Sequence, residues 1–190
     1  IISSPNHSNK KWVTEQYDQM VMGDTIERSG TNAAVIKIHN KDKAIAVTVD
    51  SSDNYCKSHP LSGGKQIVCE SWRNLISVGA KPIAITNCLN FGNPENPEIM
   101  GEFAENILGI KEACEFLDYP VVSGNVSFYN GTNNNNIYPT PVIGGVGLIK
   151  NLNKIQNHKF KKIDSQIILV GKTFGHIDQS AFVNHLYNLH

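Results

Sequence analysis

Residues 81–127, KPIAITNCLNFGNPENPEIMGEFAENILGIKEACEFLDYPVVSGNVS, contain the pattern that decides the fold. The first apolar run, at residues 82–86, predicts a short strand that leads into a loop at residues 87–95. From residue 97 to residue 117 the apolar side chains recur at helical spacing and form one continuous stripe, which predicts a core-packed helix. A second short apolar run leads into a polar loop at residues 123–127. The stretch therefore predicts two strands that flank one helix, with a polar loop after each strand.

The sequence on either side of this stretch extends the same domain. Residues 33–38 and 44–49 are two β-type runs joined by a polar turn, which predicts a hairpin. Apolar residues at helical spacing predict an amphipathic helix at residues 65–78, and residues 142–149 predict another strand. The glycines at residues 144–147 lie inside that strand pattern, which favours close backbone packing over a phosphate-binding loop. Because strands and helices alternate irregularly after an early hairpin, the pattern predicts an α+β or mixed α/β fold.

The last part of the sequence indicates the start of a second domain. Residues 151–162 have the polar composition of a linker, and a strand at residues 166–171 and a helix at residues 178–187 are predicted after it. We therefore expect one domain at residues 1–157 and the truncated beginning of another at residues 158–190. Because the chain begins without Met and stops in mid-pattern, we also expect it to be part of a longer protein.

Composition limits the classes of partner. The chain has 190 residues, 40% of them hydrophobic, and 17 basic residues balance 17 acidic ones. This balance lacks the basic surface of a nucleic-acid or membrane binder, so we expect a small molecule or another protein chain as partner. The four cysteines are far apart without a CxxC pair, which predicts free thiols in a reducing compartment. No stretch approaches the roughly 20 apolar residues of a membrane span, and we expect a cytoplasmic protein.

Glu70 and Asn74 are the first candidates for chemistry. They lie four residues apart in a predicted helix and therefore on one face of it. Both side chains carry oxygen atoms of the kind that Mg²⁺ accepts. The spacing permits a metal site, but Glu and Asn on a helix surface are more often simply solvated, so both interpretations stay open.

Two polar loops offer further ligand-binding groups. The segment SGNVS at residues 123–127 provides a glycine N–H, an amide and two hydroxyls, which suit phosphate oxygens, although Gly-Asn is also common in ordinary turns. The loop at residues 87–95 follows a strand, where ligands bind in open sheets, or it is a rigid turn. None of the seven histidines forms a nucleophile motif with Ser or Cys, so the sequence predicts no catalytic triad.

Five motifs occur in the order and spacing of one enzyme family. They are ESWRN at residues 70–74, GAKP at 79–82, LNFGNPE at 89–95, SGNVSFYN at 123–130 and PTPVIG at 139–144. Through them the chain resembles subunit II of phosphoribosylformylglycinamidine synthases, the short-form PurL family, over residues 15–187. That family resembles two aminoimidazole-ribonucleotide-synthetase-like (AIR-synthetase-like) halves in tandem. The chain looks like the N-terminal domain of the second half, followed by the start of the next α+β domain.

The resemblance implies both a fold and an activity. The implied fold is that of the AIR-synthetase N-terminal domain, whose sheet pairs with a second copy to form a barrel with the helices outside. The implied activity is that of an ATP- and Mg²⁺-dependent ligase of purine biosynthesis. It converts formylglycinamide ribonucleotide and glutamine-derived ammonia to formylglycinamidine ribonucleotide. The implied partners are a glutaminase subunit and a small accessory subunit.

The resemblance also implies roles for single residues. Gly124 and Asn87 match ATP-binding positions, Asn125 matches a magnesium ligand, and Ser127 matches a substrate contact. No catalytic residue is expected, because the family's catalytic His and most metal-binding carboxylates belong to the first half. We therefore expect the isolated chain to be inactive. We also expect it to self-associate as a dimer through the sheet surface that the first half would cover.

Glu70 and Asn74 match metal-binding positions of an auxiliary nucleotide site in the family. Two residues depart from the family pattern: Asn32 replaces the Asp of a DAAV hairpin, and Asn87 replaces an ATP-contacting Asp before LNFG. Each change removes a negative charge, so metal affinity at Asn32 is expected to fall. The amide oxygen of Asn87 still accepts a hydrogen bond as Asp would.

Two other assignments compete with the synthase. Selenophosphate synthetase and thiamine-phosphate kinase would share the fold, but their acidic hairpin is missing here, whereas LNFGNPE and SGNVSxYN are present. A non-catalytic nucleotide-binding or assembly module would use this piece as a half-site that docks onto a partner. The neighbouring sequence would discriminate, because a first half that contains His-Asn-His-Pro indicates the enzyme.

Overall fold

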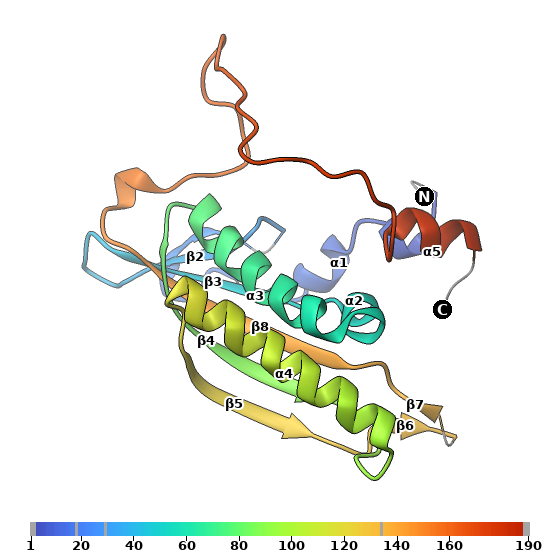
Figure 1. Ribbon diagram of the computed structural model, residues 1–190. Coiled ribbons are helices and arrows are strands. Elements are labelled where there is room, and N and C mark those ends of the chain that lie inside the picture. Colours follow the sequence, from blue (N-terminus) through green and yellow to red (C-terminus); the bar gives the residue numbers. More distant parts are fainter. Residues whose placement is uncertain (1–2, 18, 29, 134, 188–190) are drawn as a thin grey trace. The chain divides into compact units, whose positions relative to one another are not determined.

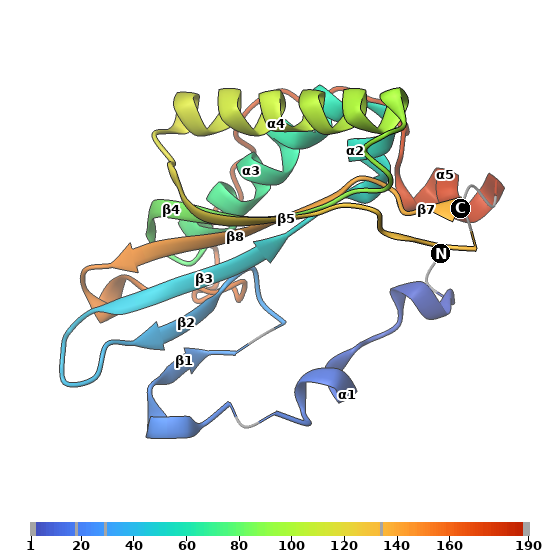
Figure 2. The same cartoon turned by 90° about the horizontal axis from the view of Figure 1, so that it is seen from below.

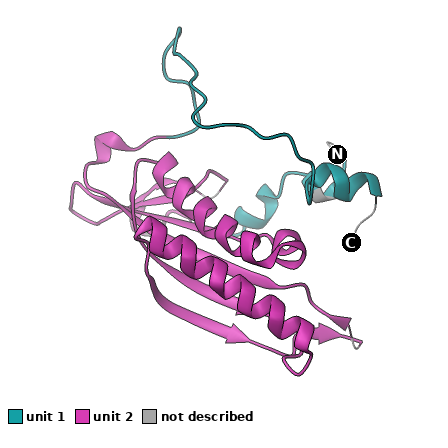
Figure 3. Cartoon of the chain, viewed as in Figure 1, with its two compact units in different colours: residues 1–17, 157–190 teal, residues 18–156 magenta. Residues whose placement is uncertain are grey.

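The computed structural model describes residues 3–17, 19–28, 30–133 and 135–187. The chain divides into two compact units, one of residues 18–156 and one of residues 1–17 and 157–190 (Figure 3). Every strand of the described residues belongs to the larger unit. Within the same described ranges, no helix is long and apolar enough to cross a membrane.

A six-stranded mixed sheet is the centre of the larger unit (Figure 1). Its strands are β1 Thr25–Glu27, β2 Ala34–Lys37, β3 Ala44–Asp50, β4 Lys81–Asn90, β5 Val121–Ser127 and β8 Thr140–Ile149. They lie in the order β1-β2-β3-β8-β4-β5. Strands β4 and β5 are parallel, and every other neighbouring pair is antiparallel. The mixed sheet confirms the predicted α+β class.

Shorter elements complete the larger unit. The predicted hairpin is confirmed, because β2 and β3 pair in antiparallel fashion, with Ala34 opposite Val47 and Lys37 opposite Ala44. Strands β6 Gly131–Thr132 and β7 Asn135–Asn136 form a separate antiparallel ribbon. The other short elements described in this unit are the 3-10 helices η2 Val21–Gly23 and η3 Leu152–Lys154.

Helices α2 Asp53–Ser58, α3 Pro60–Ser77 and α4 Pro97–Leu117 belong to the same unit, and α3 and α4 pack on one face of the sheet (Figure 2). The predicted bounds of α4 are confirmed. The helix begins where the side chain of Asn96 accepts a hydrogen bond from the Glu98 backbone N–H at 2.9 Å. It ends at Asp118, which adopts the left-handed conformation. Helix α4 is the crossover that parallel strands such as β4 and β5 require.

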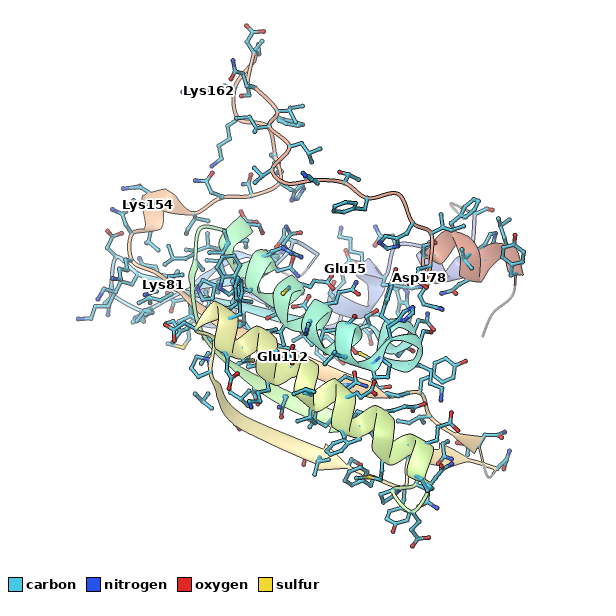
Figure 4. The ribbon with its side chains drawn as sticks, in the orientation of Figure 1. Glu15, Lys81, Glu112, Lys154, Lys162 and Asp178 are labelled. Carbon is cyan, nitrogen blue, oxygen red and sulfur yellow. The ribbon has the colours of Figure 1, made fainter. Side chains whose placement is uncertain are left out.

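Helix α3 begins at Pro60, earlier than the predicted residue 65. The prediction was wrong because Gly63 and Gly64 resemble a loop in sequence, whereas here they allow close helix packing. A Cβ atom added to Gly64 would lie 2.4 Å from the backbone oxygen of Asn106 in α4. An ion pair between Lys65 of α3 and Glu112 of α4, at 2.5 Å, also joins these helices (Figure 4 labels Glu112).

The structure corrects both predicted polar loops. Strand β4 continues to Asn90, and residues 123–127 belong to β5 rather than to a loop. The register pairs Asn87 with Gly124 and Asn90 with Ser127. The strand pattern depends on burial, and β5 is exposed along almost its whole length, so polar residues hid this strand in the sequence.

The glycines of β8 confirm the packing interpretation. A Cβ atom on Gly145 would lie 2.2 Å from the hydroxyl oxygen of Ser71 and 2.4 Å from that of Tyr119. Only a residue without a side chain allows α3 to lie this close to the sheet. The buried core between the sheet and the helices includes Ile67, Leu75, Ile85, Ile110 and Ile143.

We call the sheet face that α3 and α4 cover the helix face, and the opposite face the open face. Among the described residues of the larger unit, helices pack on the helix face only (Figure 2). Large apolar side chains are exposed on the open face, namely those of Ile36, Ile45, Val49 and Val146. A second sheet surface would bury them.

The smaller unit contains the 3-10 helix η1 Pro5–His7, α1 Lys11–Thr14 and α5 Ala181–Tyr187. The predicted helix at 178–187 is present from residue 181, and its last predicted residues 188–190 lie outside the described residues. The strand predicted at 166–171 is wrong, because these residues form no strand and the side chains of Ile167 to Val170 are exposed. A strand needs a neighbouring strand for its backbone hydrogen bonds, and no strand of the described residues pairs with this segment. The second domain at 158–190 stays a prediction.

Candidate functional site

The parallel pair of β4 and β5 brings the two predicted ligand-binding segments together. Asn87 lies opposite Gly124, Cys88 opposite Asn125, and Asn90 opposite Ser127. The segments LNFG and SGNVS are far apart in sequence, but the α4 crossover returns the chain to the neighbouring position in the sheet. The carboxyl ends of both strands therefore lie at the same edge, a usual place for ligand binding.

Alternation along the strands separates these residues onto two faces. Leu89 is buried in the core, so Asn87, two residues earlier, also points to the helix face, and its register partner Gly124 lies on that side. Asn125 and Ser127 alternate with Gly124 and point to the open face. The predicted ATP-binding pair and the predicted metal and substrate residues thus lie on opposite faces of the same strand edge.

Gly124 and Asn87 are in close contact. A Cβ atom on Gly124 would lie 2.2 Å from Oδ1 of Asn87. Glycine therefore leaves room for the Asn87 amide between the two strands. The contact makes the positions of the two residues interdependent.

Asn87 lies in the wall of a cavity of about 420 Å³ beside α4 and the start of β5. Its walls are largely apolar, with contributions from Ile107, Ile110, Cys114, Tyr119, Pro120 and Val121. Lys111, Glu115 and Asp118 add charged groups. A concave, mostly apolar site with a few polar groups is typical of small-molecule binding, and this volume falls within the usual range of about 300–1,000 Å³.

The open face of the same edge is polar. Nδ2 of Asn125 lies 3.9 Å from the sulfur of Cys88, a weak contact, and both residues are exposed. Ser127 is half-buried, and its hydroxyl bonds to the side chain of Asn130 at 3.2 Å. An amide oxygen and a hydroxyl two residues apart on one face are groups that bind a hard cation and an acceptor oxygen, respectively.

Near Glu70 and Asn74 lies Asp50, which the sequence analysis did not single out. Nδ2 of Asn74 donates to Oδ1 of Asp50 at 2.7 Å, and the hydroxyl of Thr48 donates to Oδ2 of Asp50 at 2.8 Å. Asp50 is buried and ends β3 on the helix face. The signal in the sequence was an acidic residue at a position that the strand alternation predicts to be buried.

Burial raises the pKa of Asp50, while the hydrogen bonds from Thr48 and Asn74 act in the opposite direction. The pKa of Glu70 is raised by burial and then by the negative charge of Asp50, and Arg73 lowers it. The negative charge of Asp50 opposes ionisation of Glu70, so a cation between the two carboxyl groups would relieve the repulsion. Within the described ranges no three His, Cys, Asp or Glu side chains gather at one point, so amide or ligand oxygens would have to complete such a site.

The predicted metal residues therefore do not converge on one point. Glu70 and Asn74 are on α3 beside Asp50, on the helix face, whereas Asn125 is on the open face of β5. Asn32 is hydrogen-bonded to the hydroxyl of Ser77 at 2.9 Å, and that hydroxyl donates to the backbone oxygen of Asn74. Asn32 is thus connected to the end of α3 next to Asn74.

Two of the four cysteines, Cys56 and Cys114, are not activated nucleophiles. Burial raises the pKa of the Cys56 thiol to about 12 and that of Cys114 to about 11. These two thiols are protonated at neutral pH. Cys88 is exposed on the open face.

Comparison with known proteins finds a family match over the region that contains the candidate site residues. The family described as "AIR synthase related protein, N-terminal domain" matches residues 30–149, which are 120 of the 190 residues. The phosphoribosylformylglycinamidine synthase subunit PurL of Pelagibacter ubique is 59% identical over 188 residues, covering 99% of this chain and 26% of that protein. The same subunit of Azorhizobium caulinodans is 52% identical over 183 residues, covering 96% and 25%. The chain spans about a quarter of the length of these curated relatives.

Solved structures agree with the sequence relatives. PurLQS from Thermotoga maritima has a TM-score of 0.72 at 38% identity, covering 78% of this chain and 25% of that chain. T. maritima PurL complexed with ATP and the same protein complexed with FGAR each have a TM-score of 0.68 at 38% identity, covering 78% of this chain and 24% of theirs. The expected AIR-synthetase-like fold is thereby confirmed. The chain belongs to the family of AIR synthase related proteins and contains the N-terminal domain that defines it.

Proposed function

We propose that the chain is a segment of a phosphoribosylformylglycinamidine synthase subunit II. It would comprise the N-terminal domain of the second half at residues 1–157 and the beginning of the next domain at 158–190. The complete subunit would convert formylglycinamide ribonucleotide, ammonia and ATP to formylglycinamidine ribonucleotide, ADP and phosphate. One observation carries this proposal: the parallel β4–β5 pair brings the LNFG and SGNVS segments into register at one sheet edge.

ATP is the proposed nucleotide, held by Asn87 and Gly124. The cavity of about 420 Å³ beside Asn87 supports this role because it has apolar walls for a flat base and an amide for hydrogen bonding. T. maritima PurL has been obtained complexed with ATP, at 38% identity to this chain. An Asn in place of the family's Asp keeps an acceptor oxygen, so base or ribose recognition does not require the lost charge.

Mg²⁺ is the proposed metal, and the available donors fit its preference for oxygen. Asn125 offers an exposed amide on the open face, and Glu70 and Asn74 offer a carboxylate and an amide next to Asp50. Bound at either place, Mg²⁺ would neutralise charge on phosphate oxygens that lie next to it. The two places would serve different ions, since they lie on opposite faces of the sheet. The Asp-to-Asn departure at Asn32 leaves the second place with one negative charge fewer.

Ser127 is the proposed substrate contact, because its hydroxyl is on the open face beside Asn125. T. maritima PurL has been obtained complexed with FGAR, that is, formylglycinamide ribonucleotide. The remaining substrate-binding and catalytic groups would come from the first half of the subunit. That half would pack its own sheet against the exposed apolar side chains of the open face. A glutaminase subunit that supplies ammonia, a small accessory subunit and a cytoplasmic location complete the proposal.

The test is turnover of formylglycinamide ribonucleotide with ATP, Mg²⁺ and ammonia, measured as ADP release and amidine formation. The complete subunit should turn over, and the 190-residue chain alone should not. An inactive complete subunit that still binds ATP would favour the alternative of a non-catalytic nucleotide-binding module. Activity of the isolated chain that persists through further purification would show that the assignment of catalytic groups to the first half is wrong.

A further inference from the structure

The turn after β5 is fixed against the segment after β4. Strand β5 ends at Ser127, and Tyr129 then adopts φ 59°, a left-handed conformation that is uncommon for a residue other than Gly, Asn or Asp. The Tyr129 N–H donates to the backbone oxygen of Gly92 at 2.9 Å, and the Asn130 N–H donates to that of Phe91 at 3.2 Å. The chain thus turns back at once and places the Asn130 side chain beside Ser127.

The orientation of the Asn130 amide follows from its neighbours. Nδ2 of Asn130 lies 3.0 Å from the backbone oxygen of Phe91 and 3.0 Å from that of Ser127. Both are acceptors only, so the nitrogen end of the amide must face them. Phe91 is itself immobilised, because its ring is fully buried and packs edge-on against Phe103 at a centroid distance of 5.0 Å.

The same amide also holds the hydroxyl of Ser127. Nδ2 of Asn130 is 3.0 Å from Oγ of Ser127, and Oδ1 of Asn130 is 3.2 Å from it. A hydroxyl has one hydrogen to donate and two lone pairs to accept with. Nδ2 has two hydrogens for three nearby oxygens, so the N–H that reaches Oγ is shared with one of the two backbone oxygens. With Oγ held by this shared bond, the serine hydrogen can rest on Oδ1 of Asn130 and turn to an incoming acceptor.

We propose that Asn130 is a positioning residue for substrate binding. It fixes Oγ of Ser127 and directs the hydroxyl hydrogen to an acceptor oxygen, of a phosphate or an amide, on the substrate. This inference rests on the proposed role of Ser127 as a substrate contact. It assigns to Asn130 no contact with the substrate itself.

Loss of the Asn130 side chain should leave the fold intact. The backbone oxygen of Phe91 keeps the bond from the Asn130 N–H, and that of Ser127 keeps the bond from the Phe91 N–H at 3.0 Å. Asn130→Ala therefore leaves neither carbonyl without a donor. Asn136 provides a matched control: its Oδ1 accepts from the Asn93 N–H at 2.8 Å and so restrains the same segment after β4. Within the described part of the chain, no hydrogen bond joins its side chain to Ser127.

The experiment is steady-state kinetics of the complete subunit with Ser127→Ala, Asn130→Ala, both together, and Asn136→Ala. Ser127→Ala should raise the KM for formylglycinamide ribonucleotide about tenfold, the effect of one lost hydrogen bond with a buried partner. Asn130→Ala should raise it by a similar factor, with little change in kcat or in the KM for ATP. The double variant should be no worse than Ser127→Ala, because both remove the same interaction. Asn136→Ala should leave the substrate KM unchanged.

Four outcomes would refute the inference. If Ser127→Ala and Asn130→Ala raise the KM for formylglycinamide ribonucleotide independently, so that their effects multiply in the double variant, Asn130 is only a structural residue. The same conclusion follows if Asn130→Ala and Asn136→Ala both raise the KM for formylglycinamide ribonucleotide and the KM for ATP equally. An effect of Ser127→Ala without one of Asn130→Ala would refute the positioning role alone. A silent Ser127→Ala would refute the proposed site, and the positioning role with it. If Asn130→Ala melts early, Asn130→Ser serves in its place, since its hydroxyl still bonds the nearby backbone.

Discussion

Gly124→Ala tests whether Gly124 and Asn87 depend on each other. The added Cβ atom would lie 2.2 Å from Oδ1 of Asn87 but 3.4 Å from the Asn87 backbone oxygen. The backbone contact is an ordinary van der Waals distance, so the amide, and not the strand, has to move by about 1 Å. Overpacking of this kind costs about 1–3 kcal/mol. Replacement of Gly by Ala in a strand recovers about 0.5–1 kcal/mol of backbone entropy. We expect the folded chain to lose about 1 kcal/mol of stability.

The sign of this effect should change when Asn87 is truncated. In an Asn87→Ala background the clash is absent, so Gly124→Ala should become neutral or stabilising by about 0.5 kcal/mol. The coupling free energy between the two positions should therefore be about 1–2 kcal/mol. Urea unfolding of the four proteins in the cycle measures it. In the complete subunit, Gly124→Ala and Asn87→Ala should weaken ATP binding by similar factors, because each removes the amide from the cavity wall.

Gly101→Ala is the matched control for this cycle. Gly101 is exposed inside α4, and a Cβ atom there would meet no atom within 4 Å. The change should stabilise the chain by about 0.5–1 kcal/mol in both backgrounds, through helix propensity alone. An equal cost of Gly124→Ala with and without the Asn87 amide would show that the strand itself resists the methyl group, and would refute the reasoning.

Three further predictions concern acidity, thiol reactivity and assembly. The pKa of Asp50 is raised by burial, so its contribution to stability is fully present below the unfolded pKa of about 3.9 and is lost as pH rises through the folded pKa. Asp50→Asn should therefore become more stable relative to the unmodified chain as pH rises from about 4 to 7, and a pH-independent difference in urea unfolding would contradict this. In the folded chain iodoacetamide should modify Cys88 before Cys56 or Cys114, whose thiols are buried and have raised pKa values, and mass spectrometry with and without denaturant would reveal the order. The isolated chain should self-associate through the apolar open face, and a monodisperse monomer by light scattering at micromolar concentration would exclude this.

Local sequence predicted the elements whose signal comes from the buried core. Helix α4 has the predicted bounds because its apolar stripe is continuous and because Asn96 and Pro97 start it. The β2–β3 hairpin was predicted for a similar reason, since β3 alternates buried and exposed residues. In each case the residues that specify the element also bury its apolar side, so local pattern and tertiary packing agree.

Other elements depend on contacts that a local pattern does not contain. Gly63 and Gly64 of α3 serve the close approach of α2 and α4, and this purpose is visible only in three dimensions. The apolar run at residues 166–171 has the composition of a strand, but within the ranges that the structure describes it pairs with no other strand. Composition sets the preference, but the hydrogen bonds of a strand come from its neighbours.

In the candidate site, too, some features could be predicted from local sequence and others depend on packing. The motifs identified Asn125 and Ser127, and the structure shows that they share the open face. They did not indicate that Asn87 and Gly124 face the other side, because both motifs were interpreted as loops without alternation. Asp50 was missed because its partner Asn74 reaches it only through the packing of α3 on β3.

Strand β5 illustrates why a functional edge is hard to predict and what holds it in place. Six of its seven residues are exposed, so burial of apolar area contributes little to its order. The strand is held instead by its backbone hydrogen bonds with β4 and by the Asn130 amide at its end. A ligand that contacts Gly124, Asn125 or Ser127 binds only the ordered strand, and it therefore stabilises that strand by mass action. The order of β5 and occupancy of the proposed site are thus thermodynamically linked, and the polar residues that conceal the strand in the sequence are those through which the linkage acts.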